Sequence, residues 1–131
     1  MRSIAGALLV FLVVLSSACG STDVASFSAG DSEIAVATSD RFRVEFEANP
    51  GVGDDWTLVG PPDAAVARLV DRRFESDAPD DVVGAPGTIS FLFEATGPGE
   101  AELVFEYCYR GCGGEGEELE RTESFALVVS P

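Results

Sequence analysis

Residues Arg41–Ala48 read RFRVEFEA, and they are followed by NPGVGDDW at Asn49–Trp56. In the first octet, apolar and charged residues alternate strictly, so the two kinds fall on opposite faces of an extended chain. This period of two is typical of a β-strand with one buried and one solvated face. In the second octet, Pro50 fixes its own φ, and the glycines permit backbone angles that other residues avoid. The stretch therefore predicts a strand, a shaped loop and a return into a second strand.

Two interpretations of the Asn49–Trp56 loop are open at this point. The simpler one is a tight turn, since Asn, Pro, Gly and Asp are the residues that turns favour. The other is an exposed, rigid tip that contacts a second molecule, because Gly51 and Gly53 have no side chains to hold another surface away. In both cases we expect Trp56 to anchor the downstream end of the loop in a hydrophobic core.

Similar alternation recurs along the chain and predicts further strands. Ala65–Phe74 fits either a strand or one helix, but glycines and prolines on both sides favour a strand. Trp56, Phe91 and Phe105 are predicted to lie in the core. The expected strands are 33–37, 41–48, 56–59, 65–74, 88–95, 100–108 and 122–129.

About seven short strands in roughly 100 residues, with no convincing helix, predict an all-β, immunoglobulin-like antiparallel β-sandwich. If successive strands reverse direction, every second connection lies at the same end of the sandwich. The long connections at 49–55, 75–87 and 110–120 then share one end, and the tight turns at 60–63 and 96–99 share the other. Because binding loops cluster on rigid scaffolds, the end with three long loops is the expected functional end.

Residues 1–18 resemble an export signal, with Arg2 ahead of an apolar stretch that is too short to span a bilayer. The sequence LSSA before Cys19 resembles the lipobox of bacterial lipoproteins, although Ser16 stands where Leu is commoner. This resemblance implies removal of residues 1–18 and lipidation of Cys19, and hence a lipoprotein anchored at the cell surface or in the periplasm. The alternative is an ordinary secretory signal cut near Ala18.

Residues 19–31 are rich in Ser, Ala and Gly and predict a flexible tether, and residues 32–131 are expected to form one domain. The formal net charge is −15, and it becomes more negative when Arg2 is removed. So acidic a surface repels nucleic acid and anionic lipid and favours basic partners. We expect a monomer whose only membrane contact is the lipid anchor.

The use of cysteine and histidine limits the chemistry. Cys108 and Cys112, in CYRGC, are expected to form a disulfide outside the cytoplasm, with Gly111 letting the chain turn back. A redox-active pair is more typical of Cys-x-x-Cys beside a βαβ unit. The chain has no His and no second Cys pair, so no metal site or cofactor is predicted.

An enzyme is not expected either. The chain has neither His nor Lys, so a Ser or Cys nucleophile lacks its ordinary base. Paired carboxylates at 54–55, 80–81 and 117–118 are of a type that performs acid–base chemistry or holds Ca²⁺, but solvated acidic loops are the commoner outcome.

The three long loops resemble those of the chagasin-like inhibitors of papain-type cysteine peptidases, inhibitor family I42. That family carries Asn-Pro-Thr-Thr-Gly followed by an aromatic residue and Trp, then Gly-x-Gly-Gly, then Arg-Pro-Trp, on an immunoglobulin-like sandwich. The resemblance covers roughly residues 31–129. The matching residues are Asn49, Pro50, Gly53 and Trp56 for the first motif, Gly84-Ala85-Pro86-Gly87 and Thr88 for the second, and Tyr107 and Arg110 near the third.

Each loop also departs from the family. Gly51-Val52 replaces Thr-Thr, Asp54 replaces the aromatic residue, and Pro86 replaces a glycine. In the third loop, Gly111-Cys112 replaces Pro-Trp. The last change removes a large aromatic side chain of the kind that often dominates binding energy at interfaces.

The resemblance implies a reversible inhibitor that needs no cofactor and occludes the cleft of a papain-type cysteine peptidase. The first loop would enter the cleft near the nucleophilic cysteine, and the other two would grip either side. The alternative is a non-inhibitory surface lipoprotein that uses the same acidic loop end to hold another extracellular protein. The implied peptidase-binding residues are Asn49, Pro50, Gly51, Val52, Gly53, Trp56, Gly84, Ala85, Pro86, Gly87, Tyr109, Arg110 and Gly111.

Overall fold

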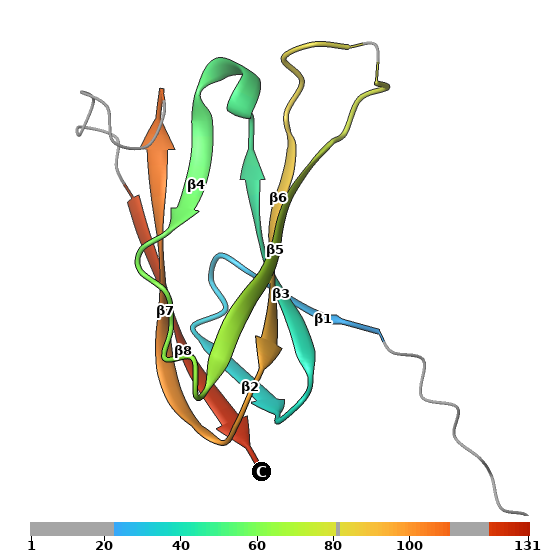
Figure 1. The fold of residues 1–131 in the computed structure, drawn as a ribbon. Coiled ribbons are helices and arrows are strands. Elements are labelled where there is room, and N and C mark those ends of the chain that lie inside the picture. Colours follow the sequence, from blue (N-terminus) through green and yellow to red (C-terminus); the bar gives the residue numbers. More distant parts are fainter. Residues whose placement is uncertain (1–22, 81, 111–120) are drawn as a thin grey trace, which may run out of the picture.

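The computed structural model describes residues 23–80, 82–110 and 121–131 (Figure 1). Where apolar and polar residues alternate in the sequence, buried and solvent-accessible residues alternate in the strands. Every second residue of the central strand β6 is buried, and β3 follows the same pattern from Phe42 to Ala48. The described strands are β1 (Ala25–Ser28), β2 (Glu33–Ala37), β3 (Arg41–Ala48), β4 (Asp54–Leu58), β5 (Ala67–Ser76), β6 (Gly87–Ala95), β7 (Gly99–Tyr109) and β8 (Arg121–Ser130). A short 3₁₀ helix, η1 (Pro50–Val52), separates β3 from β4.

The strands form two four-stranded sheets, so the predicted all-β sandwich is confirmed. The first sheet, called sheet A, has the order β1-β3-β6-β5, and the second, sheet B, has the order β2-β8-β7-β4. The pairings β3–β6, β5–β6, β4–β7 and β7–β8 are antiparallel, as predicted, whereas β1 with β3 and β2 with β8 are parallel. The reason is that the amino-terminal segment pairs first with one sheet and then, after a turn at Gly30, with the other.

The expected flexible tether, residues 19–31, contains strand β1, so order begins earlier than the composition suggested. β1 pairs with the edge of β3, and the Phe27 ring meets the Phe42 ring edge-on at 6.3 Å between centroids. One apolar side chain among small polar residues therefore holds this segment against the core. Cys19 and the expected export signal lie outside the described residues.

The ambiguous segment at 65–74 is a strand, as predicted. It forms β5, an edge strand whose register with β6 shifts between Leu69 and Asp71. Its exposed charged residues are typical of an edge that must not pair with other molecules. A smaller difference from the prediction is that β4 begins at Asp54 rather than Trp56, which shortens the first loop.

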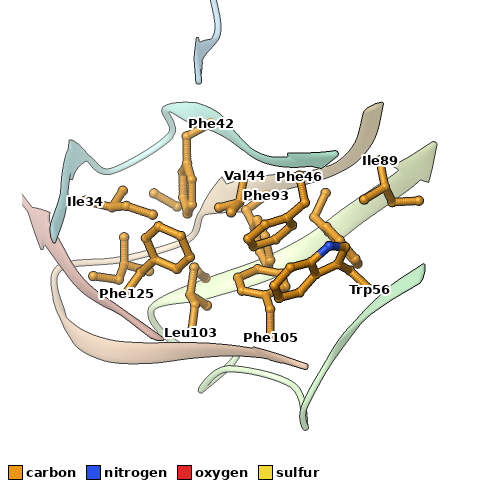
Figure 2. Packing of buried hydrophobic residues seen from close by; sticks show 14 of the residues in the cluster. Ile34, Phe42, Val44, Phe46, Trp56, Ile89, Phe93, Leu103, Phe105 and Phe125 are labelled. Carbon is orange, nitrogen blue, oxygen red and sulfur yellow. The ribbon is translucent and has the colours of Figure 1, made fainter. Parts of the chain in front are cut away.

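Aromatic rings from both sheets fill the core (Figure 2). Phe46 of sheet A stacks on Trp56 of sheet B with 4.2 Å between ring centroids, and Phe91 meets Phe105 at 4.9 Å. Trp56, Phe91 and Phe105 are each at most 2% exposed, so the predicted core residues are confirmed. Burial of each such ring stabilises the fold by about 1.5–3 kcal/mol.

The strand directions place the connections as the parity argument predicted. The β3–β4 and β5–β6 connections lie at one end of the sandwich, where β7 also ends and β8 begins (Figure 1). The β4–β5 and β6–β7 turns lie at the opposite end (Figure 1). Among the described residues, no helix has the length and apolar character needed to cross a membrane.

Candidate functional site

The first loop, residues 49–53, is a closed structure rather than an open turn. Asn49 and Asp54 form a β-bridge with Asn49 N–H donating to Asp54 O at 2.9 Å, and Val52 N–H donates to Asn49 O at 3.0 Å. Pro50 starts η1, where its fixed φ suits a helical turn. Gly53 ends η1 in the left-handed region, at φ 92°. The loop is therefore ordered by its own backbone before any partner arrives.

The second loop, residues 77–86, packs directly on the first. The Asn49 side-chain amide donates a hydrogen bond to Gly84 O at 3.0 Å. A Cβ atom at Gly51 would lie 3.3 Å from Gly84 Cα, so the two backbones approach more closely than most side chains allow. Asn49 thus has a structural role in its family motif, because it ties two loops together across 35 residues of sequence.

The third loop begins at Tyr109–Arg110 and meets the first loop on its other side. A Cβ atom at Gly53 would lie 2.5 Å from Arg110 Cα, a distance that only glycine permits. Arg110 itself has a positive φ of 59°, and its guanidinium lies 5.3 Å from the Tyr109 ring centroid. Gly51 and Gly53 therefore let the first loop sit between its two neighbours with backbone against backbone.

A polar and aromatic cluster lies next to the loops, on the side that faces the core of the sandwich. The Trp56 indole N–H donates to Glu47 O at 3.2 Å, and the Arg121 guanidinium lies over both Trp56 and Tyr107. Tyr107 donates its hydroxyl hydrogen bond to Asp54 Oδ1 at 2.9 Å. Burial raises the pKa of Tyr107 above its usual value of 10.0, and the hydrogen bond to Asp54 raises it further. The aspartate that replaces the family aromatic has therefore acquired a partner of its own.

Arg72 links the two sheets beside the first loop. From edge strand β5 its guanidinium contacts Asp55 of edge strand β4 at 2.7 and 2.8 Å, and it donates to Trp56 O at 3.3 Å. It also lies 5.7 Å from the Phe91 ring centroid. This side chain holds the downstream end of the first loop to the opposite sheet. Alternation along β5 gives no sign of this pairing, so sequence reasoning missed it.

The loop end exposes apolar side chains. Val52, at the tip of η1, is 55% exposed, and Val82 and Val83 of the second loop are 48% and 96% exposed. Val82 and Val83 were absent from the predicted site, although two adjacent valines in an otherwise acidic, glycine-rich loop are a usable signal. The first and second loops therefore both present apolar side chains to solvent.

The predicted site residues divide into exposed and buried groups. Pro50, Gly51, Val52, Gly84, Pro86 and Arg110 are exposed, and Asn49, Gly53, Ala85 and Tyr109 are partly exposed. Trp56 and Gly87 are buried, so they support the loops and offer no contact surface. Gly87 begins β6 so close to Glu75 O that a Cβ would clash. Gly111 and Cys112 lie outside the described residues.

The described part of the loop end offers a shaped surface on which another molecule could bind. Within 23–80, 82–110 and 121–131, no group of three His, Cys, Asp or Glu side chains is placed to hold a metal ion. What the site presents is a rigid backbone tip, flanking loops and exposed valines. The fold and site together define a β-sandwich whose ordered first loop lies at one end, between the second loop and the start of the third.

Comparison with known proteins places this scaffold in a family. The sequence profile of the Chagasin family peptidase inhibitor I42 matches residues 35–129, and the chain belongs to that family. A comparison with curated protein sequences gives no significant match.

Solved structures show the same fold. The solution structure of amebosin is 16% identical to this chain, covers 82% of it and 98% of its own length, and gives a TM-score of 0.66. The cysteine protease inhibitor EhICP2 from Entamoeba histolytica is 14% identical, with 81% and 95% covered and a TM-score of 0.64. PbICP-C, solved in complex with falcipain-2, is 13% identical, with 81% and 99% covered and a TM-score of 0.60.

Proposed function

We propose that this protein is a reversible inhibitor of papain-type cysteine peptidases that blocks the active-site cleft with its three loops. The observation that carries the proposal is the packing of the first loop between Gly84 and Arg110. The family consists of peptidase inhibitors, and two similar structures are a cysteine protease inhibitor and a protein in complex with falcipain-2. No covalent chemistry is needed, since inhibition is occlusion.

The geometry of the first loop favours inhibition over cleavage. A peptidase cleaves a segment that it can hold in an extended form, whereas here Asn49 to Asp54 is closed by cross-loop backbone hydrogen bonds. A loop ordered in advance also loses little conformational entropy when it docks, which favours affinity. At the tip only Pro50 and Val52 carry side chains, because residues 51 and 53 are glycines, so little side-chain bulk projects from the loop.

The first test is a titration of a papain-type peptidase with the protein, following hydrolysis of a small substrate. Stoichiometric, reversible loss of activity is expected. Val52→Glu should weaken inhibition at least tenfold, because a charge at the exposed tip must be desolvated on docking. Val59→Glu is the matched control, since Val59 is 48% exposed but precedes the turn at the opposite end.

Absence of inhibition at micromolar concentrations across several such peptidases would contradict the proposal. The loop end would then serve a non-inhibitory binding module, an alternative that the lost Thr-Thr and Pro-Trp residues favour. Equal weakening by Val52→Glu and Val59→Glu would also remove the first loop from the mechanism, because it would show a general effect of charge.

We also propose that Cys19 is lipidated after removal of residues 1–18, which would hold the inhibitor at the cell surface or in the periplasm. The support is the lipobox-like sequence before Cys19, together with an apolar segment at residues 4–15. The intact mass of the mature protein, compared with that of a Cys19→Ala variant, tests this directly. A mature chain without acyl groups would make the protein an ordinary secreted one.

A further inference from the structure

The chain joins the sandwich at the end remote from the three loops. Strand β1 runs parallel to β3 with Ala25 opposite Phe42, near the start of β3, and β3 then leads to the first loop. Asp23 and Val24 line a hollow together with Ser39 and Asp40 of the β2–β3 turn and Arg41 at the start of β3. We call this end, formed by the β2–β3 turn and its neighbours, the base (Figure 1).

The carboxyl terminus lies at the base as well. Ser130 O accepts hydrogen bonds from Thr38 N–H and from the Thr38 hydroxyl, both at 2.9 Å. Pro131, which follows, is exposed. Figure 1 shows this terminus at the end opposite the β3–β4 and β5–β6 loops. Pro131 therefore provides a point for a probe that is far from the loop end and outside the hydrogen-bonded strands.

The distance from the expected lipid anchor to the base is short. Cys19 precedes Asp23 by four residues, and four residues span at most roughly 14 Å even when fully extended. The eight residues of β3 cover roughly 26 Å between the base and the first loop. An anchor at Cys19 therefore cannot reach far enough to let the sandwich invert and rest its loops on the bilayer.

The charge distribution disfavours a sandwich that lies flat on its sheet B side. The outward-facing acidic residues of sheet B include Glu33, Glu100 and Glu102, which lie on neighbouring strands across Ala126 and Val128. The chain as a whole has a formal net charge of −15. Anionic headgroups would repel that face, whereas the base keeps only one small end of the domain near the lipid.

We propose that the anchored protein stands with its base toward the membrane and its three loops facing away, so that it captures a soluble peptidase arriving from solution. The inference rests on the proposed lipidation for its anchor and on the proposed inhibition for its partner. The register of β1 and the length of the chain before it rule out a loops-down orientation, and the acidic face of sheet B disfavours a flat one. A peptidase whose cleft lies close to the same membrane surface is out of reach.

Energy transfer to the membrane tests the orientation without any peptidase. The full lipidated protein is reconstituted in vesicles of phosphatidylcholine and anionic phosphatidylglycerol that contain a headgroup-labelled acceptor lipid, with a donor fluorophore attached at position 131 or, separately, at position 83. Val83 is 96% exposed at the loop end. Transfer should be several-fold more efficient from position 131. Equal transfer, or greater transfer from position 83, would overturn the proposal.

Two controls separate the possible failures. An insertion of about ten Gly/Ser residues after Gly20 should remove most of the difference, because a longer flexible tether lets the domain tumble. An unchanged difference would overturn the argument from tether length. A chain that carries no lipid and leaves the vesicles would overturn both anchor and orientation.

The peptidase assay then addresses the partner. Vesicle-bound and detergent-solubilised protein should inhibit a soluble papain-type peptidase equally, within about twofold. Inhibition in detergent that disappears on vesicles would overturn the outward orientation. No inhibition in either form would contradict the proposed function alone, because the energy-transfer result reports the orientation independently.

Discussion

At the scale of single residues, glycine at position 53 is required by both its own backbone and its neighbour. Its φ of 92° lies in a region that side chains disfavour, and a Cβ there would lie 2.5 Å from Arg110 Cα. Gly60 has a φ of 71°, but a Cβ at that position would have no atom within 4 Å. Substitution of Gly60 therefore tests backbone strain alone, whereas substitution of Gly53 tests backbone strain together with the packing of the first loop on the third.

Gly53→Ala should lower the free energy of unfolding by about 1–2 kcal/mol and weaken peptidase inhibition at least tenfold, because the first and third loops must move apart. Gly60→Ala should lower stability by about 1 kcal/mol and leave inhibition unchanged. Denaturant unfolding and peptidase titration of both variants measure this. Full inhibition by Gly53→Ala would show that the contact with Arg110 does not shape the binding surface.

The raised pKa of Tyr107 should make the free energy of unfolding depend on pH. Because its pKa is raised in the folded state, the folded chain keeps the phenolic proton at a pH where the unfolded chain has lost it. The resulting stability is fully present below about pH 10 and is lost as pH rises through the folded-state pKa. Tyr107→Phe should lower stability by about 1 kcal/mol at pH 7 and flatten its decline above pH 10. Parallel declines in the two proteins would contradict the assignment.

At the scale of elements, Arg72 connects two edge strands that belong to different sheets. Arg72 and Asp55 are partly exposed, so solvent screens their attraction, but the guanidinium also reaches Trp56 O and the Phe91 ring. Arg73, one residue on, makes longer ion pairs with Asp71 and Glu75, at 3.8 and 3.7 Å. Of these two neighbouring arginines on β5, Arg72 therefore contacts the opposite sheet, whereas Arg73 pairs with residues of its own strand.

Arg72→Met should lower the free energy of unfolding by about 1 kcal/mol, whereas Arg73→Met should change it by less than about 0.5 kcal/mol. If the link also holds the first loop in place, Arg72→Met should speed dissociation of the peptidase complex, and Arg73→Met should not. A double-mutant cycle with Asp55→Asn isolates the pair. Additive losses would mean that Arg72 acts through Trp56 O or packing alone.

A disulfide between Cys108 and Cys112 stays a prediction, because Cys112 lies outside the described residues. Cys108 is 4% exposed near the end of β7, two residues before Arg110. A ring closed at this point would rigidify the start of the third loop, where the family has proline. Thiol titration of unfolded, unreduced Cys19→Ala protein should find no free thiol, and two free thiols would exclude the bridge.

The sequence predicted elements whose information is local and missed those that depend on contacts. The alternation of apolar and polar residues within β3, β6 and β7 predicts which of their side chains are buried. The reversal of direction from strand to strand predicts which connections share one end of the sandwich. β1 was missed because only Phe27 marks it, and its parallel partner is distant in sequence. The link from Arg72 to Asp55 and the approach of Gly53 to Arg110 involve residues far apart in the chain. A local sequence pattern therefore cannot predict these contacts.

At the scale of the whole molecule, the two outer faces differ in charge. The outer face of sheet A combines both signs, with Arg41 and Arg68 each paired to Glu94. On the outer face of sheet B, Glu33 and Glu102 flank Ala126 on neighbouring strands, roughly 10 Å apart. Exposed ion pairs contribute little, so repulsion within a net charge of −15 should dominate the response to salt.

The Tm should therefore rise by several degrees when NaCl is raised from 10 mM to 150 mM, because the Debye length falls from about 30 Å to about 8 Å. Glu102→Gln should reduce this rise, since it removes one of the two facing charges. Glu94→Gln is the matched control: it removes the same charge but also two ion pairs, so it should lower the Tm at low salt. A Tm that falls with added salt in the unsubstituted protein would show that the sheet A ion pairs outweigh the repulsion, and that the acidic face of sheet B contributes little to the electrostatic free energy of the fold.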